Sequence, residues 1–298
     1  MRIANKTIYD SIINKLGQTT TELMDAQEVV STTKKINTLS DDPVGLVTVL
    51  DLKSSLENIA QMKRNISFGK SWLTAGETAL TQAQDILVQA KELCVQMSSA
   101  NVNSTERNNA QTVVDGYLRQ MVSLANSQVG ERYIFSGTNT DTVPFAFNSG
   151  ETQVLYSGND TAFSIKIGRD SNIEISRDGE DIFGENWDDT NIFKTLMDLK
   201  TALQNNDVTE IQAAMNKLDA HQKTLSAAVS SGAGKTIRLN VREEIIENLQ
   251  LTYKERQAEL EDVDITEAIM NLNAKELTYN AALSSASKVM SMSLLDYV

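Results

Sequence analysis

The stretch LTAGETALTQAQDILVQAKELCVQM, residues 73–97, carries the pattern that decides the fold. Large apolar residues recur in it every seven positions, at Leu73, Leu80, Leu87 and Cys94. A second series of small or apolar residues follows three positions after each, at Gly76, Ala83, Ala90 and Met97. This spacing is typical of the seam of a coiled coil. The same register extends back through Ile66 and Ile59 to Leu52, and it predicts one long helix from 43 to about 99.

A helix of that length sets the class of protein. At ~1.5 Å per residue it would be roughly 80 Å long, which is typical of a rod and not of the core of a compact enzyme. Cys94 lies on the seam, so we expect it to be a buried apolar residue and not a reactive thiol.

The composition agrees with long helices and excludes several function classes. Aromatic residues make up 5% of the 298 residues and there are 2 prolines, which disfavours a sandwich or barrel. The net charge of −13 argues against nucleic-acid binding and against docking on an anionic membrane. With 1 cysteine and 1 histidine, neither a multi-cysteine metal site nor a His-rich one can be built. No apolar run is long enough to span a membrane, and the N-terminus does not resemble a secretory signal peptide.

Amphipathic patterns also occupy both ends of the chain. Residues 2–35 carry apolar positions that step by three and four, among them Ile12, Leu16 and Leu23. The end of the chain repeats this pattern, among other positions at Leu272, Tyr279, Leu283 and Met290. Neither helix can bury its stripe alone, so we expect the two terminal helices to pair with each other.

Between the ends, the pattern changes twice. Asp42 and Pro43 predict a helix start, and the polar stretch 99–109 predicts a reversal into a third helix that folds back as a hairpin. Short runs of strand-forming residues bounded by Gly, Asn and Asp fill 130 to about 185, which predicts a small β-rich domain. Helical patterns return at 192–203, at 211–229 and from about 235.

SSGAGKT, residues 230–236, resembles the end of a phosphate-binding loop. Such a loop needs a glycine at position 229, where this chain has Val229, and a strand before it. We therefore expect a break between two helices here and no nucleotide. No cofactor, metal or catalytic site is expected elsewhere in the chain.

Several stretches together resemble the flagellin superfamily of bacterial axial proteins, over nearly the whole chain. They are MRIANKTIYDSIINKL at 1–16, LSDDPVG at 39–45, the helical hairpin at 80–126, and the C-terminal helices at 216–240 and 259–272. GERYIFSGTNTDTVPF at 130–145 is similar, within that superfamily, to the hook–filament junction proteins, the L-type hook-associated proteins. This chain differs from those proteins in the small size of its β-rich stretch, residues 130–185.

The resemblance implies a mainly α fold with a small β-rich domain, an elongated flagellin-like coiled-coil rod with paired N- and C-terminal helices. It divides the chain into a terminal assembly domain (1–42 plus 264–298), a helical rod domain (43–129 plus 186–263) and an outer β-rich domain (130–185). It also implies a non-enzymatic, structural subunit of the bacterial flagellum that joins hook to filament. Its expected partners are the hook-side junction protein, flagellin, further copies in a helical ring, and a flagellar export chaperone. The expected location is extracellular, after type III export without a cleaved signal.

In such a protein the terminal helices would be largely disordered in the monomer and would fold on assembly. We therefore expect the assembly interface to include Ile12, Leu16, Leu23, Leu272, Tyr279, Leu283 and Met290. These residues can equally form an intramolecular core between the two terminal helices. The alternatives are a flagellin of the filament, which would polymerise when purified, an unrelated coiled-coil structural, signalling or adhesion protein, and a hydrolase using paired carboxylates.

Overall fold

The structure is a computed structural model that describes the backbone of residues 2–176, 178–184 and 187–295. The described chain is mainly helical with a small β-rich region, as the sequence predicts. It forms two compact units, one of residues 1–58 with 248–298 and the other of residues 59–247. Two long helices contribute to both units, α2 (Pro43–Met97) and α6 (Val208–Glu261). The finer three-part division stays a prediction.

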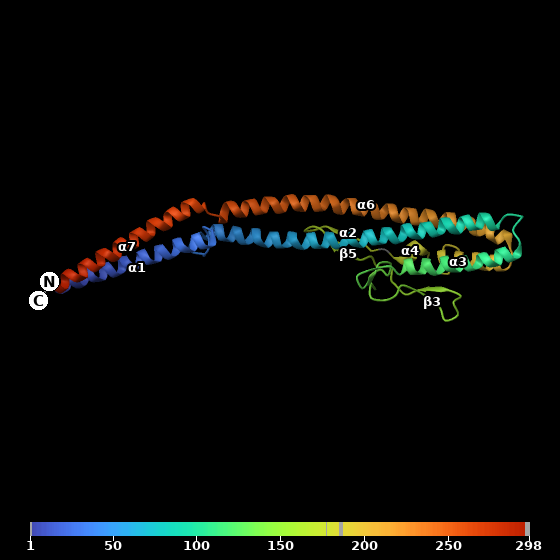
Figure 1. Cartoon of the computed structure of the whole chain (residues 1–298), viewed down its shortest axis with the longest axis horizontal. Coiled ribbons are helices and arrows are strands. Elements are labelled where there is room, and N and C mark those ends of the chain that lie inside the picture. Colours follow the sequence, from blue (N-terminus) through green and yellow to red (C-terminus); the bar gives the residue numbers. More distant parts are fainter. Residues whose placement is uncertain (1, 177, 185–186, 296–298) are drawn as a thin grey trace. The chain divides into compact units, whose positions relative to one another are not determined.

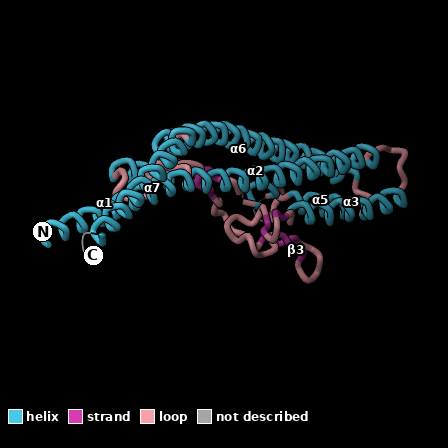
Figure 2. The backbone as a smooth tube through the Cα atoms, turned by 60° about the vertical axis from the view of Figure 1, so that its left-hand side comes forward, coloured by secondary structure: helices cyan, strands magenta, loops and turns pink. Residues whose placement is uncertain are grey.

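In the first unit, the helices from the two ends of the chain pair with each other. α1 (Arg2–Thr32) and α7 (Ile265–Leu295) lie side by side in both views (Figures 1 and 2). Small buried side chains, at Ala26 on α1 and at Ala268 and Ala286 on α7, allow the two helices to approach closely. The predicted pairing of the terminal helices is confirmed.

Side-chain caps fix where the helices of this unit begin. Oδ1 of Asp42 accepts hydrogen bonds from the amides of Val44 (3.1 Å) and Gly45 (2.9 Å), so α2 begins at Pro43 as predicted. Asp264 does the same for α7, because its Oδ1 accepts from the amide of Thr266 at 2.8 Å.

In the second unit, α2 and α6 run antiparallel and share the predicted seam. Both heptad series of α2 are buried from Gly69 onward, and α6 buries its own apolar residues at Leu218, Leu225, Leu239 and Ile246. Ion pairs border the seam, joining Lys63 to Glu247 (2.7 Å), Lys70 to Glu243 (2.8 Å) and Lys91 to Asp219 (2.5 Å). This arrangement matches a coiled coil, whose apolar seam is flanked by charged pairs.

The chain reverses after α2, as predicted, and α3 (Ser104–Ala125) returns beside it (Figure 1). Asn103 caps α3 in a capping box with Glu106. The buried Arg107 fixes the reversal, since its guanidinium donates to the carbonyl oxygens of Met97 (2.8 Å) and Ser99 (3.0 Å). The next long helix, α5 (Ile192–Gln204), packs against α3.

The described residues of the β-rich region form three antiparallel strand pairs and one short helix, α4 (Gly179–Phe183). The pairs are β1 (Gln128–Val129) with β2 (Arg132–Tyr133), β3 (Phe145–Phe147) with β4 (Val154–Tyr156), and β5 (Ser164–Lys166) with β6 (Asn172–Glu174). Phe145, Phe183 and Phe193 pack together with ring centroids 5.1–5.7 Å apart. This aromatic cluster joins the strands to α4 and α5.

The predicted break at residues 230–236 is wrong, because α6 continues through it without interruption. A glycine costs about 1 kcal/mol in a helix, but unlike proline it breaks no backbone hydrogen bond. Leu225 and Leu239, one on each side of the stretch, are fully buried. Packing of α6 on both sides of its glycines therefore outweighs the low helix propensity of Gly232 and Gly234.

Candidate functional site

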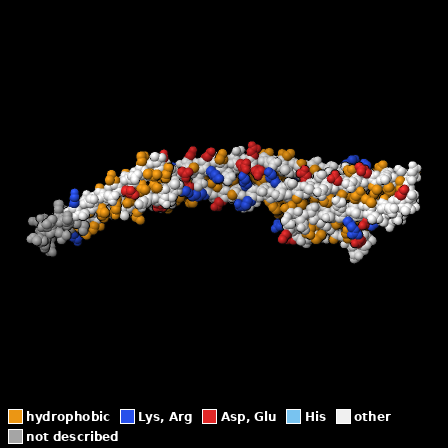
Figure 3. Space-filling model, viewed as in Figure 1, with side chains coloured by type: hydrophobic (Ala, Val, Ile, Leu, Met, Phe, Trp, Pro, Cys, Tyr) orange, Lys and Arg blue, Asp and Glu red, His pale blue; other side chains and the backbone are white. Residues whose placement is uncertain are grey.

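The paired terminal helices expose several large apolar side chains. The exposed fraction is 63% for Met24, 62% for Met270 and 72% for Leu277, and a further set is exposed by 42–49%, namely Tyr9, Ile13, Ile265, Ile269 and Leu283. Figure 3 shows hydrophobic side chains gathered along this part of the molecule. Single exposed apolar residues are ordinary, but a set of them on two paired helices favours a surface that contacts another protein.

The order of residues along each helix determines which side chains are buried in the pair and which are exposed. The buried residues of α1 and α7 are small, namely Thr19, Ala26, Ala268 and Ala286. Two helices can cover only one face of each other, so apolar residues elsewhere around α1 and α7 stay exposed among the described residues. We name these exposed apolar residues of α1 and α7 the terminal apolar surface.

The seven predicted interface residues lie in three kinds of position. Ile12, Leu16, Leu23, Leu272 and Tyr279 are half-buried on α1 and α7. Leu283 is exposed and belongs to the terminal apolar surface. The side chain of Met290 lies outside the described residues. The structure brings the described members together on one helix pair, and their contact with other subunits stays a prediction.

A groove of about 140 Å³ runs between the two terminal helices. Ile12, Leu16 and Lys15 line it from α1, and Ala282, Ser285 and Ala286 line it from α7. Because most of this lining is apolar, the groove suits an apolar side chain better than a charged ligand.

Charge plays a small part in the pairing of α1 and α7. Nζ of Lys275 lies 2.7 Å from Oε2 of Glu22. The hydrogen bond and positive charge of Lys275 lower the pKa of Glu22 below its ordinary value. Both side chains are exposed to solvent to a large degree, so the pair aligns the helices more than it stabilises them.

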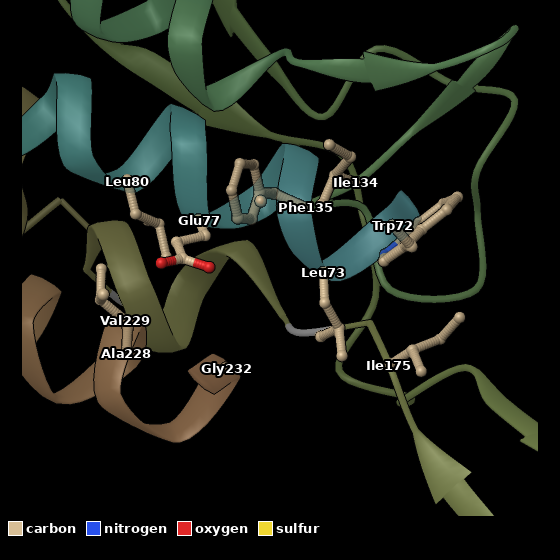
Figure 4. Close-up of a pocket in the computed structure, with 11 residues that line it drawn as sticks. Trp72, Leu73, Glu77, Leu80, Ile134, Phe135, Ile175, Ala228, Val229 and Gly232 are labelled. Carbon is tan, nitrogen blue, oxygen red and sulfur yellow. The ribbon is translucent and has the colours of Figure 1, made fainter. Parts of the chain in front are cut away.

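A second candidate site is a small pocket in the second unit (Figure 4). α2, α6 and the β-rich region line it with mostly apolar residues, including Trp72, Leu80 and Phe135, and Glu77 is its one ionisable residue. Nε1 of Trp72 is buried and has no hydrogen-bond partner among the described residues. The volume of about 30 Å³ accommodates a water molecule but no substrate, and one carboxylate provides no acid–base pair.

The remaining polar chemistry of the described chain is structural. His221 is buried, and its Nε2 lies 2.8 Å from Oγ1 of Thr195. Cys94 is buried on the seam, and burial raises the pKa of its thiol to about 12, so it is not a reactive thiolate. Within the part of the chain that the structure describes, no three His, Cys, Asp or Glu residues are placed to hold a metal ion. None of the described helices has the length and apolar character that a membrane span requires.

Sequence reasoning missed Glu261, which lies at the junction of α6 and α7. It is buried although it is a glutamate, and it accepts ion pairs from Lys34 (2.7 Å) and Lys53 (2.9 Å). No local sequence pattern predicts the burial of Glu261, because both lysines that pair with it lie more than 200 residues away in the sequence.

Three comparisons with known proteins agree with this arrangement. Residues 3–140 match the model of the bacterial flagellin N-terminal helical region. The chain is 24% identical, over 94% of its length and 96% of the relative's length, to flagellar hook-associated protein 3 of Escherichia coli (strain K12).

Solved structures show the same fold. That of a flagellar hook-associated protein from Vibrio parahaemolyticus is 21% identical, has a TM-score of 0.69 and covers 74% of this chain and 100% of its own. That of the flagellar junction protein FlgL from Legionella pneumophila is 14% identical, has a TM-score of 0.52 and covers 74% of this chain and 100% of its own. The resemblance found in the sequence, to the flagellin superfamily and within it to the hook-associated junction proteins, is confirmed.

Proposed function

We propose that this chain, which resembles flagellar hook-associated protein 3 along nearly its whole length and carries the flagellin N-terminal helical region, is a structural subunit of the bacterial flagellum that joins hook to filament. The observation that carries the proposal is the terminal apolar surface on the paired α1 and α7. A non-enzymatic role agrees with the structural nature of these relatives.

The junction reading is favoured over a flagellin of the filament. Both curated relatives that match over nearly the whole chain are named flagellar hook-associated protein 3, and neither is named flagellin. A flagellin would also form filaments when purified alone, so polymerisation of this chain without hooks would count for that alternative.

A junction subunit lies between two helical lattices, so its expected partners come from both of them. The chain would contact the hook-side junction protein on one side, flagellin on the other, and further copies of itself in a ring. Contacts that join different surfaces of neighbouring copies propagate as an open helix, which suits the transfer of one lattice to the next. An export chaperone would cover the terminal helices before assembly, and the chain would leave the cell through the flagellar export apparatus without a cleaved signal.

Assembly would be driven by burial of the terminal apolar surface. A lone amphipathic helix is marginally stable in water, so α1 and α7 gain order when neighbouring subunits cover their apolar faces. Full burial of a Leu or Met side chain contributes about 1.5–3 kcal/mol. A few such residues in each subunit are sufficient to stabilise a contact that many subunits repeat.

The test is binding of the purified full chain to isolated hooks that carry the hook-side junction protein, measured by co-sedimentation. Leu277→Glu places a carboxylate at the most exposed large apolar residue among the described side chains of α7 and should reduce the bound fraction at least about tenfold, since an unpaired charge is costly to bury. Its helix content by circular dichroism should stay native, because this side chain packs on nothing in the free chain.

Leu155→Glu is the matched control. Leu155 is an exposed leucine of β4, in the β-rich region that is expected to form the outer domain of the assembled protein. Its replacement should leave hook binding unchanged. Wild-type binding by Leu277→Glu, or equal loss in both variants, would contradict the proposed function.

A further inference from the structure

The two links that lead into the terminal helices meet each other in space. Residues 33–42 join α1 to α2, and residues 262–264 join α6 to α7. The amide of Lys35 donates to the carbonyl oxygen of Glu261 at 2.8 Å, and the amide of Val263 donates to that of Thr33 at 3.2 Å. Lys34 and Asp262 thereby form an antiparallel bridge between segments more than 200 residues apart.

The side chain of Glu261 lies where these segments meet. Only 4% of it is exposed, and its two oxygens accept from three different groups. Oε1 accepts from Lys34 (2.7 Å) and Lys53 (2.9 Å), while Oε2 accepts from Gln257 (2.8 Å). One carboxylate therefore contacts the first link, the third turn of α2 and the end of α6.

Loss of these ion pairs would affect Glu261 more than the two lysines. Lys34 and Lys53 are 38% and 42% exposed, so water can solvate either ammonium group if the contact is lost. Glu261 is buried and depends on both lysines, because a buried carboxylate without a cation is strongly disfavoured. Burial raises the pKa of Glu261, but the hydrogen bonds from Gln257, Lys34 and Lys53 outweigh this effect and lower the pKa to about 2. The group is therefore ionised at neutral pH.

We propose that Glu261 is a positioning residue that ties the α1–α2 link to the α6–α7 link, so that the two links open and close as one unit. α1 then ends, and α7 then begins, at one shared anchor. If the proposed function holds, this anchor also positions α1 and α7 for contact with neighbouring subunits. The coupling itself is a property of the free chain and is tested there.

The experiment is amide hydrogen exchange of the full chain, free in solution, followed in peptides that cover residues 33–38 and 260–265. Glu261→Gln keeps the shape of the side chain and removes its charge. It should accelerate exchange at least tenfold in both peptides and by similar factors. Glu259→Gln, which removes an exposed carboxylate two residues earlier, should change neither.

Lys53 provides the sharper variant, because it belongs to neither link. Lys53→Met removes one cation that faces Glu261, and it should accelerate exchange in both links, while Lys53→Arg should restore the slow rates. This pair also serves if Glu261→Gln disturbs the whole fold, which faster exchange in α3 of the second unit would reveal. Since Lys53 is 42% exposed, its loss is not expected to unfold the chain.

Acceleration of one link without the other, or of neither, in Lys53→Met and Glu261→Gln would overturn the proposal. The outcome is separate from that of the proposed function. A chain whose links show the predicted coupling and which fails to bind hooks would count against the junction role alone.

Discussion

At the scale of single residues, His221 shows how burial determines the chemistry of a polar group. Its imidazole is buried within the second unit against Thr195, which lies on α5. Burial, and after it the positive charge of Lys217, lower the pKa of His221 from 6.5 to about 4. The only histidine of the chain is therefore neutral in the folded protein at neutral pH.

This shift predicts a loss of stability in mild acid. The unfolded chain binds a proton at His221 near pH 6.5 and the folded chain only near pH 4, so the free energy of unfolding falls as the pH decreases between these values. The loss from this one group should reach at most about 3 kcal/mol. Urea unfolding at pH 7 and pH 4 measures it.

His221→Gln provides the comparison, because carboxylates also titrate toward pH 4 and contribute to the total. The variant should lose less stability than the wild-type chain between the two pH values. Equal losses would show that His221 is not held neutral by the fold.

At this scale, a position that repeats leaves a signal in the sequence, whereas a unique contact leaves none. Ile12 and Leu16 were found from their helical spacing, and they line the groove between α1 and α7. Glu261 was not found, because its burial depends on two links that approach only in the folded chain. A buried carboxylate with distant partners leaves no periodic signal.

At the scale of elements, the α2 helix was predicted almost to its ends, and its charged border could have been. Lys63, Lys70 and Lys91 fall at multiples of seven from one another, and each pairs with an acidic residue of α6. The seam showed that α2 needs a partner, while this lysine series is the signal that its partner is acidic on the facing edge. Strand positions were predicted within 130–185, but the separation into three two-stranded pairs was not.

The continuity of α6 through residues 230–236 leads to a prediction for its glycines. Gly234 is exposed, and a Cβ added there would meet nothing within 4 Å. Gly234→Ala should therefore raise the free energy of unfolding by about 0.5–1 kcal/mol, because alanine loses less backbone freedom than glycine when a helix forms. Urea denaturation gives the difference.

Gly184→Ala is the opposite case and serves as the control. Gly184 follows α4 with φ of 111°, and a Cβ there would collide with the backbone of Thr190 and Asn191. This variant should lose at least about 1–3 kcal/mol. If Gly234→Ala were destabilising as well, the stretch would not be a regular helix in solution, and the predicted break would have been right.

At the scale of the whole molecule, both terminal helices leave large apolar side chains exposed. α1 and α7 expose Met24, Met270 and Leu277. Under the proposed function, neighbouring subunits would cover these residues and complete the core that the terminal pair begins. The sequence predicted the pairing from two matching patterns, but not which faces stay exposed, since this depends on how the two helices are rotated against each other.

The most direct test of this account is amide hydrogen exchange of α1 and α7 in the purified chain, alone and after binding to hooks that carry the hook-side junction protein. The account predicts fast exchange in the free chain and strong protection after binding, because neighbouring subunits then cover the terminal apolar surface. Strong protection of both helices in the free chain, unchanged on binding, would contradict it. The terminal pair would then be a complete core, and assembly through these helices would have to be abandoned.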